Sequence, residues 1–356
     1  MIGPREPQTP RVAGVRRIHA VVDAHNLVQD DRGIGRYARA VLVRALEDPR
    51  FRFTLVVRSL FPRASPFSRV LGNANVTVRR RVPKDADVVW FPWNGTFLGC
   101  EAPSVATVHD ATPFAYPSPS ARTRETEQGP FLRTAATAKR ILVQSNFTAG
   151  EVERWLGVDR RRIVVTPLAA DALVFRPGPV GKLPAVVGRE PYLLYVGAHD
   201  ERKNTATLFE AYARAFPART PRLIVTRRPA VVPPGVAVVD DCSDAELVSL
   251  YRGALFVVAP SPYEGFGLPV LEALGCGAPV LAARGGALAE IGGDAVGWVD
   301  EPMRVDAWVD ALRALAADGA ARTRLSLAGP PHAATFSWSR CATQTLAVLR
   351  EVAEDR

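Results

Sequence analysis

The sequence has little cysteine and no long apolar run. Its 356 residues include four cysteines, at positions 100, 242, 276 and 341, with no paired spacing. This scatter argues against a disulfide framework and a cysteine-based metal site, and it is typical of a reducing cytoplasm. No apolar run approaches the roughly 20 residues that a membrane-spanning helix needs. Residues 1–17 lack the apolar core of a secretory signal, and we interpret them as a mobile tail.

Lysine is also scarce, so the positive charge is carried almost entirely by arginine. Lysine occurs only at positions 84, 139, 182 and 203, whereas the formal net charge is +9. A basic balance suits an anionic ligand, an anionic membrane surface or nucleic acid. The arginine clusters at 79–81 and 160–162 are not interleaved with aromatic residues, which favours solvated surface arginines over a nucleic-acid site. We therefore expect no nucleic-acid partner and leave peripheral attachment to an anionic membrane open.

What the sequence does contain is a regular alternation of strand and helix patterns. Short apolar runs typical of buried strands alternate with segments of helical periodicity in both halves. A segment rich in proline and glycine, 176–191, separates the halves and is interpreted as a linker. The alternation predicts two doubly wound, Rossmann-like α/β domains facing each other across a cleft. Their predicted bounds are 18–175 and 192–335, and 336–356 follow as a last helix.

The stretch 255–282 combines a buried strand, a loop and a helix. The apolar run 255–259 has the length of a buried strand. A turn rich in proline, serine and glycine follows; Pro269 suits a first helical residue, and Gly275 and Gly277 favour the helix end. The loop therefore lies at the carboxyl end of a strand, with a helix amino end pointing into it. Ligands bind at such places in open α/β sheets, and anions are favoured there.

Two glutamates bracket this loop. Glu264 closely follows the strand, and Glu272 lies eight positions later in the first helical turn. With Gly265 and Gly267 between them, the pair predicts a ligand that has both hydroxyl groups and phosphates. Two other interpretations exist: the carboxylates could serve only as partners of the helix amino end, or they could form an acid and nucleophile pair of the glycosidase type.

Three further candidates lie where predicted strands end. Gly33 and Gly35 lie between a strand and the helix that follows it, and the lack of a side chain would let the backbone approach a ligand closely. A plain turn is the alternative. His109 comes directly after the predicted strand Ser104–Val108, the place that Glu264 has in the other half. Loops beyond strand ends face the cleft, so we expect a functional rather than a structural histidine.

A cation pair occupies the corresponding loop at the start of the second half. Arg202 and Lys203 lie between a predicted strand, 192–196, and a helix from about residue 205. Two cations next to a helix amino end make a strong anion site. Surface charge in a loop is the alternative interpretation.

Taken together, these segments resemble the GT-B retaining glycosyltransferases of the group 1, or family 4, type. The resemblance covers nearly the whole chain from Ile18 and is most specific at the E-x7-E signature in 261–282. In chain order, the matching segments are 32–42, 105–117, 138–152 with 166–171, 195–204, 261–282 and 336–349. In this fold the last helix crosses back onto the first domain.

The resemblance implies a function for each charged candidate. Glu272 would bind the ribose of a nucleotide-sugar donor, and Glu264 would contact the hydroxyls of the donor sugar. Arg202 and Lys203 would neutralise the diphosphate, whose charge grows as the glycosidic bond breaks. His109 would bind the donor sugar near the reacting carbon.

The resemblance also implies that the main chain completes the donor site. The N–H groups expected to hold the sugar and diphosphate are those of Gly265, Phe266, Gly267 and Leu268. From the first domain, Gly33 and Gly35 would press against the donor phosphate. No metal or other cofactor is then expected. The reaction would retain the anomeric configuration by front-face attack, with the leaving phosphate accepting the proton of the acceptor.

The predicted function is therefore that of a retaining hexosyltransferase in polysaccharide or cell-envelope synthesis. The segment 33–37 is similar to that of bacterial mannosyl- or rhamnosyltransferases, so GDP-mannose is the leading donor. The acceptor would be a glycan or a lipid-linked molecule held by the loops 62–68 and 114–127. The alternatives are glycosylation of an antibiotic or another small molecule, a nucleotide-sugar epimerase, and a binding protein without catalysis. We expect a cytoplasmic enzyme, with attachment to the inner face of the membrane left open.

Overall fold

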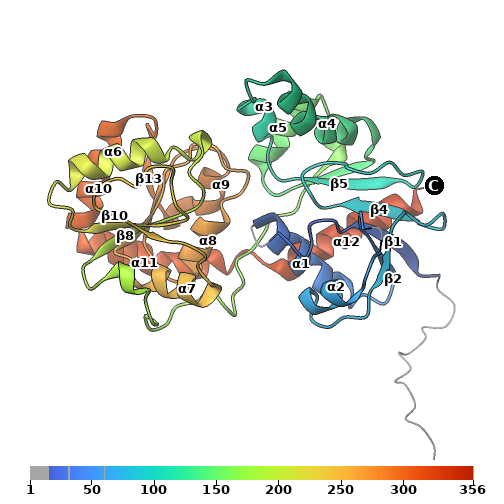
Figure 1. Cartoon of the computed structure of the whole chain (residues 1–356), viewed down its shortest axis with the longest axis horizontal. Helices are drawn as coiled ribbons and strands as arrows, with labels where there is room; N and C mark the ends of the chain where they lie inside the picture. The colour runs from blue at the N-terminus through green and yellow to red at the C-terminus, as the bar shows by residue number, and fades with distance from the viewer. Residues whose placement is uncertain (1–15, 31–32, 60, 356) are drawn as a thin grey trace, which may run out of the picture.

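Two parallel sheets form the framework of the chain (Figure 1). The computed structural model describes residues 16–30, 33–59 and 61–355. Most of the predicted tail 1–17, and Arg32 at the start of the glycine motif, lie outside the described residues. The first sheet has seven strands in the order β3-β2-β1-β4-β5-β6-β7, and the second has six in the order β10-β9-β8-β11-β12-β13. Every strand pairing within both sheets is parallel, as two doubly wound domains require.

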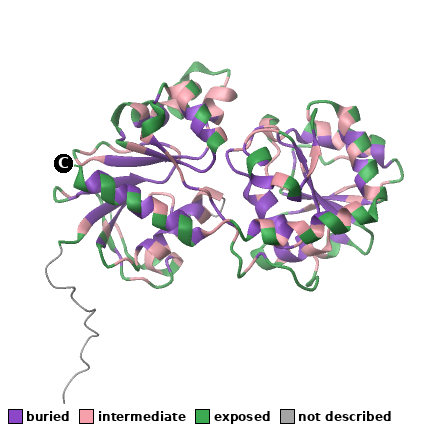
Figure 2. Cartoon of the chain, turned by 180° about the vertical axis from the view of Figure 1, so that it is seen from behind, coloured by how far each residue is buried: buried purple, intermediate pink, exposed green. Residues whose placement is uncertain are grey.

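The strands are short and mostly buried on both faces. β5 and β12 are buried at every position, and Figure 2 shows the buried residues concentrated in the two sheets. This is why parallel strands read as continuous apolar runs in the sequence. The strand bounds are β1 Ile18–Asp23, β2 Phe51–Val56, β3 Thr77–Arg79, β4 Val88–Phe91, β5 Ser104–Val108, β6 Arg140–Val143, β7 Ile163–Val165, β8 Tyr192–Val196, β9 Arg222–Thr226, β10 Val236–Val239, β11 Phe256–Ala259, β12 Val280–Ala283 and β13 Gly297–Val299.

Helices cover both sheets, and serine side chains cap several of them. Ser145 accepts a hydrogen bond from the main chain of Thr148 at the start of α5, and Ser243 forms a capping box with Glu246 at the start of α7. The helix bounds are α1 Gly33–Ala45, α2 Ser65–Val70, α3 Thr112–Ala115, α4 Ala121–Thr137, α5 Asn146–Leu156, α6 Thr205–Ala215, α7 Asp244–Gly253, α8 Leu268–Gly275, α9 Leu288–Gly292, α10 Val305–Ala317, α11 Gly319–Ala333 and α12 Trp338–Glu354, with short 3-10 turns at Arg160–Arg162, Ala185–Val187, Glu201–Lys203 and Gly293–Ala295.

The last helix returns to the first half of the molecule. α12 follows the second sheet in sequence but packs on α1 and on strands β1, β4, β5 and β6 of the first sheet (Figure 1). Its buried side includes Leu346, Leu349 and Val352, which recur at helical spacing. The predicted crossing back is therefore present.

The structure corrects two predictions about segments near the cleft. Gly33 and Gly35 do not lie in a loop before the helix, because α1 already begins at Gly33. An added Cβ at Gly35 would lie 1.7 Å from the carbonyl oxygen of Asp30, so this first turn packs against the preceding chain too closely for a side chain. The predicted acceptor loops are also largely helical, since α2 begins within 62–68, and α3 and the start of α4 occupy 114–127.

Candidate active site between the two sheets

The strand–loop–helix unit of the second half ends in a turn that needs glycine. β11 leads into residues 260–267, and α8 starts at Leu268 with Gly267 as its N-cap. Gly267 has a φ of 102°, and an added Cβ would lie 2.4 Å from the Leu288 side chain. Within the described residues, the main-chain N–H groups of Gly265, Phe266 and Gly267 donate no hydrogen bond. The amino end of α8 thus presents free donors to a ligand.

Glu264 lies between the two predicted cations. Lys203 Nζ donates to Glu264 Oε1 at 2.5 Å, and Arg202 Nη1 lies 3.5 Å from Glu264 Oε2. All three side chains are about five-sixths buried, with exposed fractions of 16–17%. The carboxylate and the burial of the site therefore hold both cations in place next to the free N–H groups of the α8 turn. This combination suits a ligand that carries phosphates.

Hydrogen bonds fix the two loops of this cluster to each other. The Ser261 hydroxyl donates to the carbonyl oxygen of Arg202 at 3.0 Å. The Asn204 amide donates to the carbonyl oxygen of Pro260 at 3.2 Å. Because each loop leaves a neighbouring strand, β8 or β11, at the same edge of the sheet, the cations and Glu264 form one rigid unit.

Glu272 is buried and bonded to the first half of the molecule. Arg36 of α1 donates to Glu272 Oε1 at 2.9 Å, and the Tyr251 hydroxyl donates to Oε2 at 3.2 Å. The same guanidinium also pairs with Asp244. Burial raises the pKa of Glu272 to about 7, although Arg36 and Tyr251 oppose this rise. Glu272 is thus a carboxylate that titrates near neutral pH at the contact between the two halves.

His109 lies at the end of β5, where the sequence predicted it. Its main-chain N–H donates to the Asn94 side chain at 2.8 Å, and its Nε2 lies 2.9 Å from the carbonyl oxygen of Pro92. A carbonyl oxygen only accepts, so Nε2 carries the hydrogen. Burial lowers the pKa of His109, which keeps the ring neutral at pH 7 and leaves Nδ1 as an acceptor. The ring also packs edge-on against Tyr37.

Glycines let the two halves approach at this site. An added Cβ at Gly265 would lie 1.9 Å from the carbonyl oxygen of His109, and one at Gly33 would lie 3.3 Å from Leu268. The first turn of α1 therefore approaches the start of α8, and the α8 turn approaches His109. Five of the predicted site residues thus meet at the junction: Gly33, His109, Gly265, Leu268 and Glu272. Glu264 is next to Gly265 on the same loop, and its two cations reach it from the neighbouring loop of the second half. Gly267 packs on Leu288 within the second half. Gly35 faces Asp30 instead.

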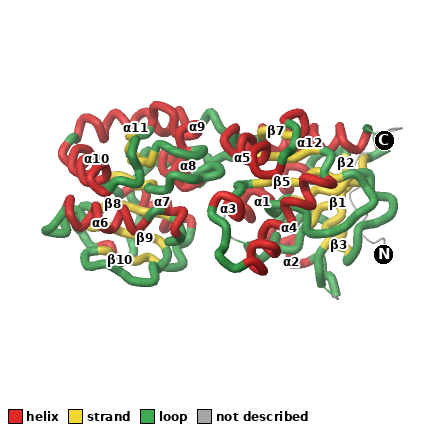
Figure 3. Tube along the Cα trace, turned by 90° about the horizontal axis from the view of Figure 1, so that it is seen from above, coloured by secondary structure: helices red, strands yellow, loops and turns green. Residues whose placement is uncertain are grey.

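The start of α5 clamps the α8 turn from the first half. The hydroxyls of Ser145 and Thr148 both donate to the carbonyl oxygen of Gly265, at 2.8 and 3.1 Å. The Tyr263 hydroxyl donates to the Glu151 carboxylate at 2.8 Å. Figure 3 shows α5 of the first half facing α8 and α9 of the second. Hydrogen bonds from α5 therefore hold residues 263–265, next to Glu264, against the first half.

A cavity of about 650 Å³ lies beside Glu272. Both halves line it, with Arg36 and Val43 from α1, Phe175 from the segment after β7, and Asp244 and Leu268 from the second half. Its volume is in the range of small-molecule sites. It reaches Glu272 and Leu268, but His109, Glu264, Arg202 and Lys203 are not among its lining residues. The candidate residues therefore form two groups: one lines the cavity at Glu272 and Leu268, and the other lies outside it around Glu264 and His109. The loop 264–268 joins the two groups.

Sequence reasoning missed Arg36 and Gln144. Arg36 lies in the first turn of α1, where a cation opposes the helix dipole, and this unfavourable position was the available signal. Gln144 directly follows β6 at the same sheet edge as His109 and is fully buried. Its amide lies close enough to the His109 ring to raise the pKa of that ring, against the effect of burial, yet neither amide atom has a hydrogen bond of good geometry within the described part of the chain. Buried polar side chains are nearly always hydrogen-bonded, so an amide in this state needs a structural or functional reason.

Acidic and metal-ligating side chains are otherwise dispersed. Within 16–30, 33–59 and 61–355, no three His, Cys, Asp or Glu side chains are grouped so that they could hold a metal ion. The sequence does contain one Asp-x-Asp triplet, at 85–87. Its carboxylates face away from the junction: Asp85 pairs with Arg52, and Asp87 accepts from Arg16 and from the main chain of His19.

No helix in the described ranges is long and apolar enough to cross a membrane.

Comparisons with known sequences match both halves of the chain. The family described as glycosyl transferases group 1 matches residues 232–330, and Glycosyltransferase Family 4 matches residues 15–172. The chain is 33% identical over 269 residues to the O-antigen chain mannosyltransferase B of Escherichia coli, a match that covers 68% of this chain and 69% of that protein. It is 31% identical over 261 residues to a D-inositol 3-phosphate glycosyltransferase of Nocardiopsis dassonvillei, covering 66% of this chain but only 59% of that relative.

Solved structures share the whole fold at low identity. A sucrose-phosphate synthase from Thermosynechococcus elongatus has a TM-score of 0.73 and 18% identity, covering 96% of this chain and 100% of that one. The Anabaena protein HepE in complex with UDP-glucose has a TM-score of 0.70 and 13% identity, covering 94% and 100%. These likenesses show that the two facing α/β halves are arranged as in GT-B glycosyltransferases.

Proposed function

The chain belongs to the group 1 glycosyltransferases of the GT-B fold, and from this premise we propose that it transfers a hexose from a nucleotide-sugar donor with retention of configuration. The observation that carries the proposal is the meeting of Lys203, Arg202 and Glu264 with the free N–H groups of the α8 turn. These groups can neutralise a diphosphate leaving group and hydrogen-bond the sugar that it carries.

Each half contributes a different part of the proposed reaction. The diphosphate would bind at Arg202, Lys203 and the α8 turn, and the ribose at Glu272. As the bond from the anomeric carbon to the diphosphate breaks, the acceptor oxygen bonds to the same face of that carbon. Its proton passes to a phosphate oxygen of the leaving diphosphate, so charge and atoms balance without a protein base. His109, neutral and with Nδ1 as its acceptor atom, would orient a donor hydroxyl from the first half.

For the donor we propose mannose carried by GDP. The name of the Escherichia coli relative, a mannosyltransferase of O-antigen chains, supports this sugar, and it also supports a glycan or lipid-linked acceptor in polysaccharide synthesis. The HepE neighbour was solved with UDP-glucose, which makes UDP-glucose the second donor to test. We further propose that transfer needs no metal; addition of a chelator should therefore leave the rate unchanged, and a loss restored by Mg²⁺ would overturn this point.

Donor binding is the first test. We expect one of GDP-mannose, UDP-glucose or a dTDP-sugar to bind in calorimetric titrations, and Lys203→Gln and Glu272→Gln to weaken binding by about tenfold or more, because each removes a charged hydrogen bond. Lys182→Gln, which removes an exposed lysine of the linker, is the matched control. If no nucleotide sugar binds the parent, or if both variants bind as well as Lys182→Gln, the site assignment is wrong.

Other uses of the same site give different products. A nucleotide-sugar epimerase would change the donor without an acceptor, which NMR of the donor alone would reveal. A binding protein without catalysis would bind the donor and leave it intact in the presence of every acceptor. Transfer to an antibiotic or another small molecule would appear as a glycosylated product in mass spectra of acceptor mixtures. Turnover of His109→Ala at the parental rate would remove His109 from the reaction.

A further inference from the structure

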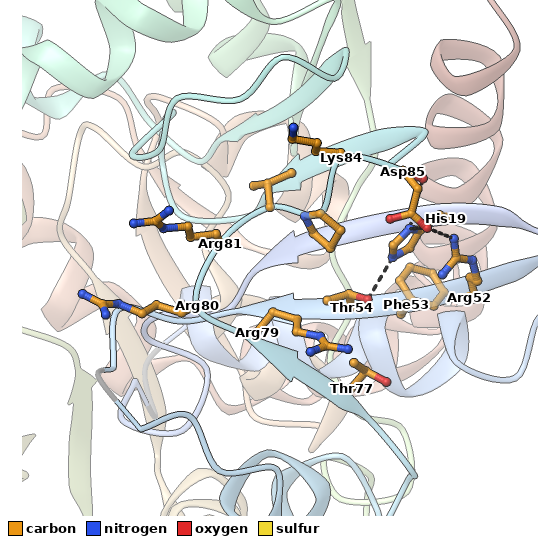
Figure 4. Close-up of a pocket in the computed structure, with 12 residues that line it drawn as sticks. His19, Arg52, Phe53, Thr54, Thr77, Arg79, Arg80, Arg81, Lys84 and Asp85 are labelled. Carbon is orange, nitrogen blue, oxygen red and sulfur yellow. Dashed lines mark hydrogen bonds and ion pairs between the residues drawn. The ribbon is translucent and has the colours of Figure 1, made fainter.

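The first sheet carries a second cavity, away from the contact between the halves. It has a volume of about 780 Å³ and lies under the chain that connects β3 to β4 (Figure 4). In Figure 4, Arg80 and Arg81 lie at one end of the cavity and Arg52 and Asp85 at the other. The remaining charged lining residues are Arg79 and Lys84.

Positive charge in this cavity is not matched by acidic side chains. Five cationic residues line it, and Asp85 is the one carboxylate among the lining residues. That carboxylate is already bonded to Arg52 at 2.6 Å. Among the described residues, none forms an ion pair with Arg79, Arg80, Arg81 or Lys84. Four solvent-exposed cations therefore line one cavity without an ion-pair partner among the described residues, which favours an anionic ligand.

The other arginine cluster shows what a purely structural triplet looks like in this chain. Arg161 forms a bidentate pair with Asp159, and Arg160 lies 3.9 Å from the Glu153 carboxylate. Arg162 donates to the carbonyl oxygens of Ala135 and Ala138. Every member of that triplet has a protein partner. The 79–81 triplet differs in this respect, although the two clusters are indistinguishable by sequence.

The floor of the cavity is fixed by a buried histidine. His19 is 2% exposed; its Nε2 lies 2.9 Å from the Thr54 hydroxyl and its Nδ1 lies 3.1 Å from the carbonyl oxygen of Asp85. These bonds tie β1 and β2 to the end of the covering chain (Figure 4). The cations are thus mounted on a chain segment that is anchored at both ends, by β3 and by His19.

The strand register places the cationic end of this cavity at the cleft edge of the sheet. Arg79 pairs with Val56, and Val56 pairs with Asp23 at the carboxyl end of β1. The strand order β3-β2-β1-β4-β5 and the register place Arg79 level with Ala106 of β5, four strand spacings or about 19 Å away, and His109 follows three residues later at the end of that strand. A ligand in the cavity can therefore extend along this edge toward the proposed sugar site.

We propose that this cavity binds the phosphate or diphosphate of an acceptor whose reacting hydroxyl lies about 20 Å away, near His109. This inference rests on the proposed transferase function, for which it specifies an anionic acceptor. Phosphate oxygens are the chemistry that arginine and lysine together recognise. The phosphate can belong to a soluble glycan or to a lipid carrier at a membrane surface, and both present the same group to the cavity.

The experiment follows hydrogen–deuterium exchange of the whole chain while pyrophosphate is added. Exchange of peptides covering 77–87 reports the cavity, and exchange of peptides covering 197–205 reports the donor site, so each site is measured separately. We expect pyrophosphate to slow exchange in 77–87, and Arg79→Gln/Arg81→Gln to weaken this effect about tenfold while protection of 197–205 persists. The matched control is Arg189→Gln/Arg324→Gln, which removes two exposed arginines elsewhere.

A second arm separates the sources of phosphate. Vesicles of a zwitterionic lipid, with and without a diphosphate-bearing lipid, replace pyrophosphate. Protection of 77–87 by pyrophosphate, or by the diphosphate vesicles but not the plain ones, supports the cavity as the site. Absence of protection in both arms, or equal protection in the Arg79→Gln/Arg81→Gln variant, overturns it. Failure of the donor site would instead appear as nucleotide sugars leaving 197–205 unprotected, whatever happens in 77–87.

Discussion

Glu272 brings together burial, charge and the contact between the halves in one side chain. Arg36 and Tyr251 each donate one hydrogen bond to its carboxylate, yet burial still raises its pKa to about 7. The ordinary value of a glutamate is 4.5, so ionising this group opposes folding. Its contribution to stability accordingly falls as the pH rises from about 4.5 through 7. A ribose hydroxyl, by contrast, donates best to the ionised carboxylate.

Donor binding should therefore strengthen as the pH rises through about 7. In Arg36→Gln the cation that opposes the pKa rise is gone, so the midpoint of this pH dependence should move upward. Donor affinity measured by calorimetry from about pH 5.5 to about pH 8.5 checks both points. Arg69→Gln, an exposed arginine of α2, should keep the parental midpoint. A pH profile that is identical in Arg36→Gln and the parent would show that Arg36 does not set the charge of Glu272.

Gln144 provides a separate test of stability against function. Its side-chain amide is buried beside His109 without a hydrogen bond of good geometry within the described residues, and replacing such a group by an apolar one of similar shape is neutral or stabilising by about 1 kcal/mol. Gln144→Leu should therefore unfold at the same or a higher denaturant concentration, while transfer slows because the amide faces the edge that carries His109. Unfolding curves and transfer rates on the same preparation check this. Slower transfer with a clear loss of stability would point to a structural role instead.

At the scale of elements, the contact between the α8 turn and His109 depends on the absence of a side chain at Gly265. Gly265→Ala would place a carbon 1.9 Å from a carbonyl oxygen, so the two halves must separate locally. We expect donor transfer to fall by at least about tenfold, because displacements near 1 Å at a reacting site cost about a hundredfold. Gly99→Ala, where an added Cβ meets nothing within 4 Å, is the control, read by transfer rates. Full activity of Gly265→Ala would mean that the reaction does not use this contact.

The strand–loop–helix units were the most predictable part of the molecule. Strands such as β5 and β8 match their predicted bounds, because buried parallel strands leave continuous apolar runs in the sequence. The start of α1 was wrong, since glycine usually marks a loop and here reflects close packing on Asp30. α11 was missed altogether: Pro330 and Pro331 near its end suggest a break, and nothing local shows that the helix packs on α8.

In the candidate site, too, features set by local sequence were predictable and features set by packing were not. Glu264, Arg202 and Lys203 lie at strand ends, and strand ends can be located from local patterns, so their meeting was predictable. The pairing of Arg36 with Glu272 joins residues 236 positions apart. The unmatched charge of 79–81 depends on which carboxylates the fold brings near it. Neither the Arg36–Glu272 pair nor the lack of ion pairs at 79–81 can be predicted from local sequence patterns, because both depend on the three-dimensional fold.

At the scale of the whole molecule, α12 makes the first half depend on a segment made after the second. Leu349 of α12 is fully buried, and Leu349→Ala should lower the free energy of unfolding by about 2–5 kcal/mol through the cavity that it leaves. Leu327 of α11 is 73% exposed, and Leu327→Ala should change it by less than about 0.5 kcal/mol. Denaturant unfolding of both variants checks this difference. Equal effects would mean that α12 contributes no core to the first half.

The return of α12 also sets an order on biosynthesis. During translation the first sheet leaves the ribosome early, but the face that α12 covers stays bare until the second sheet has been made. A nascent chain stalled after residue 337 should therefore present an unfinished apolar surface, which chaperones recognise and proteases reach. The two halves are contiguous in sequence yet cannot mature one after the other, so the enzyme is assembled as a unit in time as well as in space.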